Sequence, residues 1–445
     1  MSQTILVIGQ GGREHAIAWK LSNELAPGSR VLVAPGNSGT CAEAIDIARA
    51  RGAAAIENCA VAVNDLHGLL ALAKTQAVDF TVVGPEVPLA LGIVDLFQAH
   101  GLAIFGPSAK AALLEASKSF TKDFLARHHI PTARYAVFTD AQLALDYLAA
   151  QSLPIVIKAD GLAAGKGVVV AQSAAQAQSA VVDMLAIGQE NQSGSDTAEV
   201  ARIVIEEFLP GTEASYIVIA SGTDFVALAT SQDHKRVGNA DTGPNTGGMG
   251  AYSPAPVVTA AIEAQIQREI IAPTLAGMKA EGREFCGFLY AGVMIDANGK
   301  ARVLEFNARL GDPETQPILS RMISPLLPLL KAAAAKKLAA LSAPIWDPRC
   351  ALGVVICASG YPSLVEKGQR ISDAAGSAEA SEHSLVFHAG SKSVQGQVFT
   401  DGGRVLCVVG LGNSVKSAQN FAYARAAALS WPGSFMREDI GWRAL

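Results

Sequence analysis

The chain has 445 residues, half of them hydrophobic and only 17% charged, so it can bury several cores, and we expect roughly two to four domains. Its net charge of −5 gives no reason to expect nucleic acid or a membrane as a partner. The six scattered cysteines form no C-x-x-C pair, which favours reduced thiols over a zinc site or a disulfide framework. The N-terminus lacks the pattern of a signal peptide, and no apolar run is long enough to span a bilayer. We therefore expect a cytoplasmic protein.

The first part of the chain alternates short apolar runs with helical segments. Strands ending at turns are expected at residues 4–9, 30–34, 80–84 and 103–106. A helix is expected at about 13–21. Such alternation predicts a parallel sheet, here a Rossmann-like domain over residues 1–116.

A second unit begins with a helical segment at 114–127. Its strands are expected at 155–159, 168–171, 202–208, 216–220 and 225–230, with a hairpin at 290–296 and 301–307. Residues 231–254 are rich in Gly, Pro, Asn and Thr and predict a long ordered loop or lid. Helices are expected near 258–281 and at 326–341.

The composition returns to short strands in the last hundred residues or so, at 351–358, 384–388 and 404–410, followed by a helix near 415–428. This pattern predicts a third, smaller α/β domain over residues 343–445.

The strand expected at 303–307 carries the most informative polar pattern. Glu305, Asn307 and Arg309 stand at alternate positions, so their side chains project from one face. Carboxylate and amide oxygens suit Mg²⁺ carrying nucleotide phosphates, and a guanidinium stabilises a phosphoryl group in transfer. The pattern therefore predicts a metal–nucleotide site. The alternative is an edge strand with a solvated polar face.

A glycine turn joins the first strand to its helix. Glu14 stands where the dinucleotide pattern G-x-G-x-x-G needs its third glycine, and no acidic residue ends the second strand, so a dehydrogenase is disfavoured. Free N–H groups at a helix N-terminus still bind phosphate, and Arg13 adds positive charge. We expect a small phosphorylated ligand here. The alternative is a packing turn.

A second glycine-rich turn, at 161–167, follows the strand that carries Lys158. It is one residue shorter than a Walker A loop, and Gly167 stands where Ser or Thr would hold Mg²⁺. Backbone donors and ammonium groups nevertheless suit a triphosphate. The alternative is a solvated hairpin with two lysines.

Two further segments carry site signals, of which the first is weak on its own. The strand near 205–208 ends at a breaker, where its backbone can pair with an adenine edge and Glu213 can reach a ribose. The polar residues of 231–250 suit a substrate amine and a phosphate or carboxylate. His234 among these charges is interpreted as a contact residue, not as a base.

In chain order, these segments resemble the ATP-grasp enzymes. The resemblance rests on Lys118, on Lys158 in Ile-Lys-Ala-Asp-Gly, on Glu206 in Glu-Glu-Phe-Leu, and on Glu305 with Asn307. Within these enzymes, four blocks resemble the phosphoribosylamine–glycine ligase family: residues 11–15, 231–236, 241–250 and 437–443.

The resemblance covers essentially the whole chain but departs from the family in two places. Ala308 and Leu310 stand where the family tends to have Cys and Phe, which predicts looser packing beside the metal strand. The segment 41–58 is longer than usual, which predicts a surface elaboration.

The resemblance implies an α/β and α+β multidomain fold with an ATP-grasp domain at 117–342, between the Rossmann-like domain and the C-terminal domain. A mobile subdomain is implied at about 135–205. The implied activity is ATP-dependent ligation of glycine to 5-phosphoribosylamine through a glycyl phosphate, in de novo purine biosynthesis. Mg²⁺ or Mn²⁺ and a monomer or weak dimer are implied as well.

The resemblance also implies site residues. The metal ligands are Glu305 and Asn307, and the catalytic residues are Arg309 and Lys158. The ATP-binding residues are Lys118, Lys158, Gly161, Gly165, Lys166, Gly167, Glu206, Glu207, Phe208, Leu209 and Glu213. The substrate-binding residues are Gly11, Gly12, Arg13, Asp233, Lys235, Arg236, Asp312, Pro313, Glu314 and Thr315.

The residues leave two alternative functions open. Another ATP-grasp ligase or carboxylase would share the nucleotide motifs and differ at 231–250 and at the first glycine turn. A nucleotide-regulated binding protein without turnover would not need Arg309.

Overall fold

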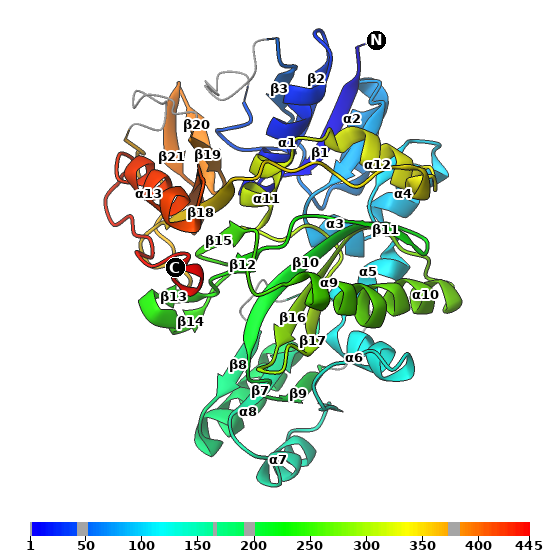
Figure 1. The fold of residues 1–445 in the computed structure, drawn as a ribbon, viewed down its shortest axis with the longest axis vertical. Helices are drawn as coiled ribbons and strands as arrows, with labels where there is room; N and C mark the ends of the chain where they lie inside the picture. The colour runs from blue at the N-terminus through cyan, green and yellow to red at the C-terminus, as the bar shows by residue number, and fades with distance from the viewer. Residues whose placement is uncertain (1, 42–51, 163–166, 191–200, 373–382) are drawn as a thin grey trace.

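The computed structural model describes residues 2–41, 52–162, 167–190, 201–372 and 383–445. Its N-terminal part, at the top of Figure 1, is a parallel sheet in the order β3-β2-β1-β4-β5. The strands are β1 (Thr4–Gly9), β2 (Arg30–Pro35), β3 (Ala55–Asn58), β4 (Phe80–Val83) and β5 (Ile104–Phe105). The helices are α1 (Gly12–Glu24), α2 (Leu66–Thr75), α3 (Glu86–Ala90), α4 (Ile93–Ala99) and α5 (Ala109–Ala116). The predicted parallel sheet is confirmed, although β3 was not foreseen.

The lower end of the molecule in Figure 1 is an antiparallel sheet in the order β6-β9-β7-β8. Its strands are β6 (Tyr135–Phe138), β7 (Ile155–Ala159), β8 (Val168–Ala171) and β9 (Ile203–Glu207). Helices α7 (Ala141–Ala149) and α8 (Ala174–Glu190) pack against each other and close its core. The strands predicted around the second glycine turn are confirmed.

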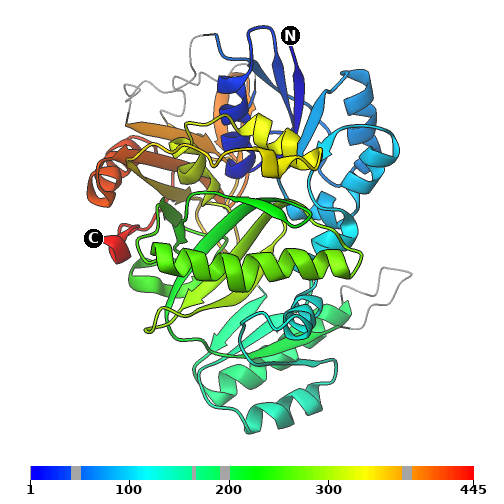
Figure 2. The ribbon, with the colours of Figure 1, turned by 45° about the vertical axis from the view of Figure 1, so that its right-hand side comes forward.

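The middle of the molecule is a second antiparallel sheet in the order β11-β10-β16-β17. Its strands are β10 (Thr212–Ser221), β11 (Asp224–Ala227), β16 (Cys286–Ile295) and β17 (Ala301–Asn307). A long helix lies across one face in Figure 2, formed by α9 (Ala260–Ile266), a π turn (Gln267–Ile271) and α10 (Ala272–Ala280). Helix α6 (Lys118–Arg127) adds Phe124 and Leu125 to the same core.

The C-terminal sheet has the order β12-β15-β18-β22-β19. Its strands are β12 (Gln232–Asp233), β15 (Gly250–Ser253), β18 (Cys350–Cys357), β19 (Ser384–His388) and β22 (Arg404–Gly412), covered by α13 (Val415–Ala426). Two small hairpins, β13 (Arg236–Gly238) with β14 (Thr242–Asn245) and β20 (Ser391–Val394) with β21 (Gln397–Thr400), complete it. Helices α11 (Thr315–Arg321) and α12 (Leu326–Ala334) connect the central and C-terminal parts.

The prediction of a long loop at 231–254 is wrong, because this segment forms β12 to β15. Strands β12 and β15 extend the C-terminal sheet, so a segment that lies within the predicted central domain in sequence forms part of the C-terminal domain in space. Gly250 makes the pairing possible: a Cβ there would lie 2.5 Å from the Gly353 carbonyl oxygen. Glycine is disfavoured in strands unless backbones approach this closely, which explains the error.

Two predicted helices are also shorter than expected. The segment 114–127 is broken at Ser117, whose extended backbone and hydroxyl cap α6 by accepting from the Phe120 N–H. The helix predicted at 326–341 ends at Ala334, and Lys336 then adopts a positive φ of 56°.

Within the described ranges, no helix combines the length and hydropathy that a bilayer crossing requires. The six cysteines are free thiols, with Cys357 and Cys407 buried.

Candidate active site

A cleft of about 920 Å³ lies between the β6-β9-β7-β8 sheet and the β11-β10-β16-β17 sheet. It continues to the N-terminal and C-terminal parts, because Arg13, Arg404 and Trp442 also line it. Most of the predicted site residues meet here. Those on its wall are Arg13, Lys118, Lys158, Gly161, Gly167, Glu206, Glu207, Phe208, Leu209, Glu213, Asp233, Lys235, Arg236, Glu305, Asn307, Arg309, Asp312 and Glu314.

A few predicted residues lie elsewhere. Gly11 lines a neighbouring cavity of about 1080 Å³ between the first glycine turn and the C-terminal part. Gly12 lies against the Gln316 side chain, and Thr315 is fully buried. Pro313 packs where a Cβ of Gly248 would be. Gly165 and Lys166 fall outside the described residues.

The start of α6 is tied to the second glycine turn. Asp160 accepts hydrogen bonds from the backbone N–H groups of Lys118 at 2.6 Å and Ser119 at 3.2 Å. The Lys118 ammonium donates to the Gly161 carbonyl at 2.7 Å. Burial lowers the pKa of Lys118. The first lysine and the glycine turn are therefore one unit at the cleft wall.

A buried carboxylate between two lysines lies beside this unit. Glu206 is 2% exposed, and its two oxygens lie 2.8 Å from Lys122 Nζ and 2.9 Å from Lys158 Nζ. Lys158 also donates to the Leu304 carbonyl at 3.0 Å, just before Glu305. Burial lowers the pKa of Lys122 to about 8, although Glu206 opposes the shift. The triad fixes Lys158 of β7 next to β17, a role for Lys122 and the Glu206 side chain that the sequence did not reveal.

We predict that Glu206→Gln lowers the free energy of unfolding by about 3–5 kcal/mol, because it leaves two buried ammonium groups without a carboxylate. The neighbouring Glu207→Gln is the matched control, since Glu207 pairs with the exposed Arg134 at 2.7 Å and little stability depends on such a pair. Urea unfolding of both variants measures the difference. Equal stabilities would contradict a structural role for the triad.

The predicted metal strand β17 is an edge strand, with a bulge at Leu304 in its pairing with β16. The Lys235 ammonium lies 3.2 Å from Glu305 Oε1 and 2.5 Å from Glu213 Oε1. The positive charge of Lys235 outweighs the opposing effect of burial and lowers the pKa of Glu305 to about 2. A positive charge is thus already held between two carboxylates.

This donor set fits a divalent cation. Glu305 and Asn307 offer hard oxygen ligands on one cleft wall, and phosphate oxygens would complete the coordination of Mg²⁺. Among the described residues there is no cluster of three His, Cys, Asp or Glu side chains of the kind that holds a metal without help from a substrate.

Two glutamates from the first part of the chain hold Arg309. Its Nη2 lies 2.7 Å from Glu115 Oε1, and its Nε lies 3.3 Å from Glu86 Oε2. Burial would lower the pKa of Arg309, but Glu115 and Glu86 raise it above its usual value. Sequence reasoning missed both glutamates. Glu86 did carry a signal, because it follows the carboxyl end of a parallel strand, where ligand sites gather.

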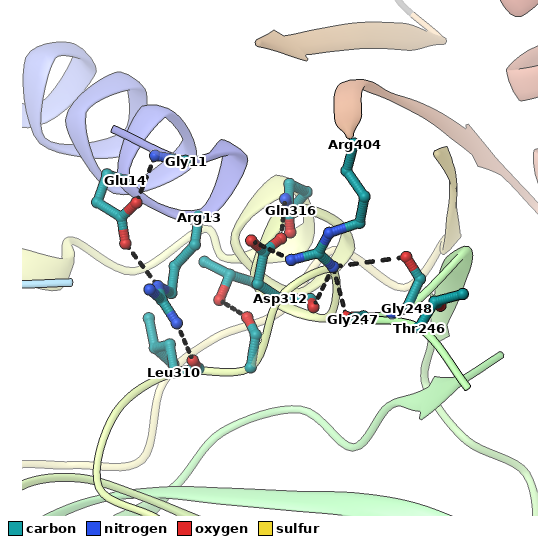
Figure 3. A network of polar contacts seen from close by, with 12 residues as sticks. Gly11, Arg13, Glu14, Thr246, Gly247, Gly248, Leu310, Asp312, Gln316 and Arg404 are labelled. Atoms are coloured by element: carbon teal, nitrogen blue, oxygen red, sulfur yellow. Dashed lines mark hydrogen bonds and ion pairs between the residues drawn. The ribbon is translucent and has the colours of Figure 1, made fainter. Parts of the chain in front are cut away.

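Figure 3 shows how the first glycine turn meets the loop after β17. Glu14 fills the position of the missing glycine and accepts from the Gly11 N–H at 2.6 Å. Arg13 donates to the Leu310 carbonyl at 3.1 Å. Arg404, which the sequence analysis missed, lies 3.0 Å from an Asp312 carboxylate oxygen and also donates to the Gly247 carbonyl. These contacts join all three parts of the chain at the rim of the cleft.

His234 is a buried structural residue that does not line the cleft, so its interpretation as a contact residue of the site is not supported. It is 0% exposed; its Nδ1 lies 3.1 Å from the Gly250 carbonyl and its Nε2 accepts from the Gly441 N–H at 3.1 Å. Burial and the neighbouring Arg443 and Arg437 lower its pKa to about 3. The ring is therefore neutral at neutral pH.

We predict that His234 makes stability depend on pH. Its folded pKa lies below the unfolded value of about 6.5, so the unfolded chain binds the proton first, and stability is lost as pH falls from about 6.5 towards 3. Urea unfolding at pH 7.5, 6.5 and 5.5 should give a smaller loss for His234→Gln than for wild type, by up to about 1.4 kcal/mol per pH unit. The exposed His67, changed to Gln, is the control, and identical pH slopes for the two variants would refute the prediction.

The fold and this cleft define an ATP-grasp enzyme. Residues 116–315 match the model of the phosphoribosylglycinamide synthetase ATP-grasp (A) domain, and residues 3–115 and 351–443 match the N and C domains of the same family. The chain belongs to the phosphoribosylglycinamide synthetase family.

Relatives agree along the whole chain. Phosphoribosylamine–glycine ligases from Xanthomonas campestris and Vibrio vulnificus are 55% and 53% identical to it, over 99% of this chain and 98% of theirs. The crystal structure of phosphoribosylamine–glycine ligase from Thermotoga maritima has a TM-score of 0.79 and 31% identity, and covers 98% of this chain and 100% of that one.

More distant structures share the fold alone. The biotin carboxylase domain of the Hydrogenobacter thermophilus 2-oxoglutarate carboxylase, solved with MgADP and bicarbonate, has a TM-score of 0.70 at 14% identity, over 98% of this chain and 92% of that one.

Proposed function

We propose that the cleft joins glycine to 5-phosphoribosylamine with ATP, giving glycinamide ribonucleotide, ADP and phosphate, as a step of purine biosynthesis. Relatives named phosphoribosylamine–glycine ligase, at 51–56% identity over 99% of the chain, support this activity. The observation that carries the proposal is that Lys158, the Glu305–Asn307 pair and Arg309 line the same cleft as Asp233 and Lys235 of the second family block.

The chemistry has two steps. A glycine carboxylate oxygen attacks the γ-phosphorus of ATP, the bond to ADP breaks, and a glycyl phosphate forms. The amine of 5-phosphoribosylamine then attacks the acyl carbon, phosphate leaves, and the amine proton is released. The first step turns a poor acylating agent into one with a leaving group, and water must be excluded while the intermediate lasts.

This chain's residues act by positioning and by charge, and need form no covalent intermediate. Lys118 and Lys158 hold α- and β-phosphates, and the glycine turn that starts at Gly161 is expected to cover them, although its residues 163–166 lie outside the described residues. The backbone of Glu207 and Leu209 faces adenine, and Glu213 the ribose. Arg309, fixed by its two glutamates, stabilises the phosphoryl group in transfer.

ATP-grasp ligases use ATP with a divalent metal, and we propose Mg²⁺, or Mn²⁺ in its place, with Glu305 and Asn307 as the ligands. The metal, when bound, neutralises phosphate charge. Lys235, which lies between Glu213 and Glu305, is the cation that would face the glycine carboxylate.

We assign the substrate end to two groups of residues. Asp233, Lys235, Arg236 and the turn at 312–315 contact glycine and the phosphoribosyl group. Gly11, Gly12 and Arg13 lie on the side of the 5′-phosphate. Since Glu14 already accepts from the Gly11 N–H, and Arg13 is itself engaged by Glu14 and the Leu310 carbonyl, we assign the 5′-phosphate to the adjoining cavity between this turn and Lys392.

ADP release with Mg²⁺-ATP, glycine and phosphoribosylamine generated in situ tests the function, each component being left out in turn. ADP formation that needs both substrates, with an equal amount of glycinamide ribonucleotide, supports it. ATP use that ignores glycine but responds to bicarbonate or another carboxylate would overturn the substrate assignment and keep the fold.

The domain limits at 116 and 342, the mobility of 135–205, a monomeric or weakly dimeric state and a cytoplasmic location stay predictions. Limited proteolysis with and without MgADP, light scattering after gel filtration, and cell fractionation measure them.

A further inference from the structure

The fourth family block, residues 437–443, has no part in the chemistry proposed above, yet it holds a dense set of ion pairs. Arg437 is 1% exposed, and its guanidinium lies 2.9 Å from Asp241 Oδ1 and 2.8 Å from Asp439 Oδ1. Arg443 lies 2.5 Å from the other oxygen of Asp241. Two arginines of the C-terminal segment therefore share one carboxylate of the turn between β13 and β14, beside which the C-terminus lies in Figure 1.

The same segment binds the backbone of the residues that enter β13. Arg443 Nη1 donates to the Asp233 carbonyl at 3.1 Å, and Arg437 Nη1 donates to the Arg236 carbonyl at 3.1 Å. Between them, the Gly441 N–H donates to His234 Nε2 at 3.1 Å. Asp233 and Arg236 are thus held from outside, on either side of Lys235.

These residues form the substrate end of the cleft. Asp233, Lys235 and Arg236 line it, and so do Trp442 and Arg443 themselves. The nucleotide end is held by other contacts, because Glu206 and the Leu304 carbonyl bind Lys158, and the Gly161 carbonyl binds Lys118. The two ends of the cleft are therefore fixed by separate parts of the chain.

We propose that the segment Arg437–Arg443 is a positioning element for the substrate end of the cleft, with Arg443 as its central positioning residue. It fixes the path of Asp233–Arg236, so that the Asp233 and Lys235 side chains meet glycine and the amine in register. The inference rests on the function proposed above for this end. Catalysis here depends on positioning, and a misplacement of about 1 Å can cost about 100-fold in rate.

Arg443→Met is the principal test, because methionine keeps much of the side-chain length and removes both polar contacts. We expect kcat/KM for glycine to fall by about 10- to 100-fold. The dissociation constant of MgADP, measured by calorimetry, should change less than about twofold. A tenfold change, about 1.4 kcal/mol, would mean that a contact with the nucleotide had been lost. Arg443→Lys should recover part of the glycine kcat/KM, since it restores one charge opposite Asp241.

Arg127→Met is the matched control. Arg127 makes a bidentate pair with Glu281 at 2.9 and 3.1 Å and does not line the cleft. The Arg127→Met variant removes an arginine–carboxylate pair of the same kind and should leave kcat/KM for glycine and the MgADP dissociation constant unchanged.

Hydrogen–deuterium exchange separates this inference from the proposed function. In Arg443→Met, amides of 233–241 should exchange faster than in wild type, while those of β7 stay the same. Unchanged exchange at 233–241, or a loss of MgADP affinity as large as the loss for glycine, would overturn the positioning role. A wild-type protein that forms no glycinamide ribonucleotide would instead refute the proposed function, and the exchange result alone would then decide this inference.

Discussion

Replacing Arg309 by methionine is expected to lower kcat for ADP release by about 1,000-fold or more, while MgADP still binds. The guanidinium is anchored at 2.7 Å by Glu115 and at 3.3 Å by Glu86, so it is oriented before substrate arrives. A preorganised charge of this kind acts on the charge that develops during phosphoryl transfer, and removal of an arginine in that role costs about 10³- to 10⁵-fold. A loss in kcat without a loss in nucleotide affinity is what an interaction confined to the transition state produces.

Two further variants make this result specific. Arg309→Lys keeps a charge between Glu86 and Glu115 but loses the planar fork, so it should fold like wild type and recover only part of the activity. Arg302→Met is the control on the same strand, since Arg302 lies 3.6 Å from Glu207 and does not line the cleft. Steady-state ADP release and MgADP calorimetry on the three proteins give the comparison. A kcat of Arg309→Met within tenfold of wild type would remove Arg309 from the catalytic step.

The parts of the fold that could be predicted are those whose signal is local. The Val- and Ile-rich runs at β1, β7, β8 and β18 can be recognised from the sequence alone, because a short apolar segment between breakers is typical of a buried strand. The polar alternation of β17 was equally readable, and Glu305, Asn307 and Arg309 do line one cleft.

The strands at 232–253 could not be predicted for a physical reason. Their sequence is dominated by Gly, Pro, Asn and Thr, and β15 gains its stability from pairing with β18, about a hundred residues later. Strand propensity in such a segment is decided by tertiary contacts, which a local pattern does not contain.

The missed site residues share another cause. Glu86, Glu115 and Arg404 are single charged residues, and apart from the position of Glu86 after a parallel strand nothing local marks them; tertiary folding brings them to Arg309 and Asp312 from 92 or more residues away. Nothing in their spacing indicates these partners. The Arg437–Arg443 block was visible as a motif, but its contact with Asp241 follows from the position of β13 and β14 alone.

Glu305→Gln is expected to raise the Mg²⁺ concentration needed for half-maximal activity by at least about tenfold and to lower kcat by about 100-fold or more, with the fold retained. The side chain keeps its size but loses the charge that a hard divalent cation requires. It also loses its pairing with Lys235, now 3.2 Å away. Direct Mn²⁺ binding in the presence of ADP, followed by electron paramagnetic resonance, measures the metal site without relying on turnover.

Glu213→Gln separates a metal ligand from a mere partner of Lys235. Glu213 lies even closer to the same ammonium, at 2.5 Å, so loss of the ion pair alone would affect both variants alike. If Glu305 holds the metal and Glu213 the ribose, Glu213→Gln should raise the KM for ATP and leave Mn²⁺ binding near that of wild type. Near-normal activity of Glu305→Gln at limiting Mg²⁺, or equal Mn²⁺ affinities in the two variants, would place the metal elsewhere in the cleft. Because Lys235 contacts both Glu213 and Glu305, each of these two variants serves as the control for the other.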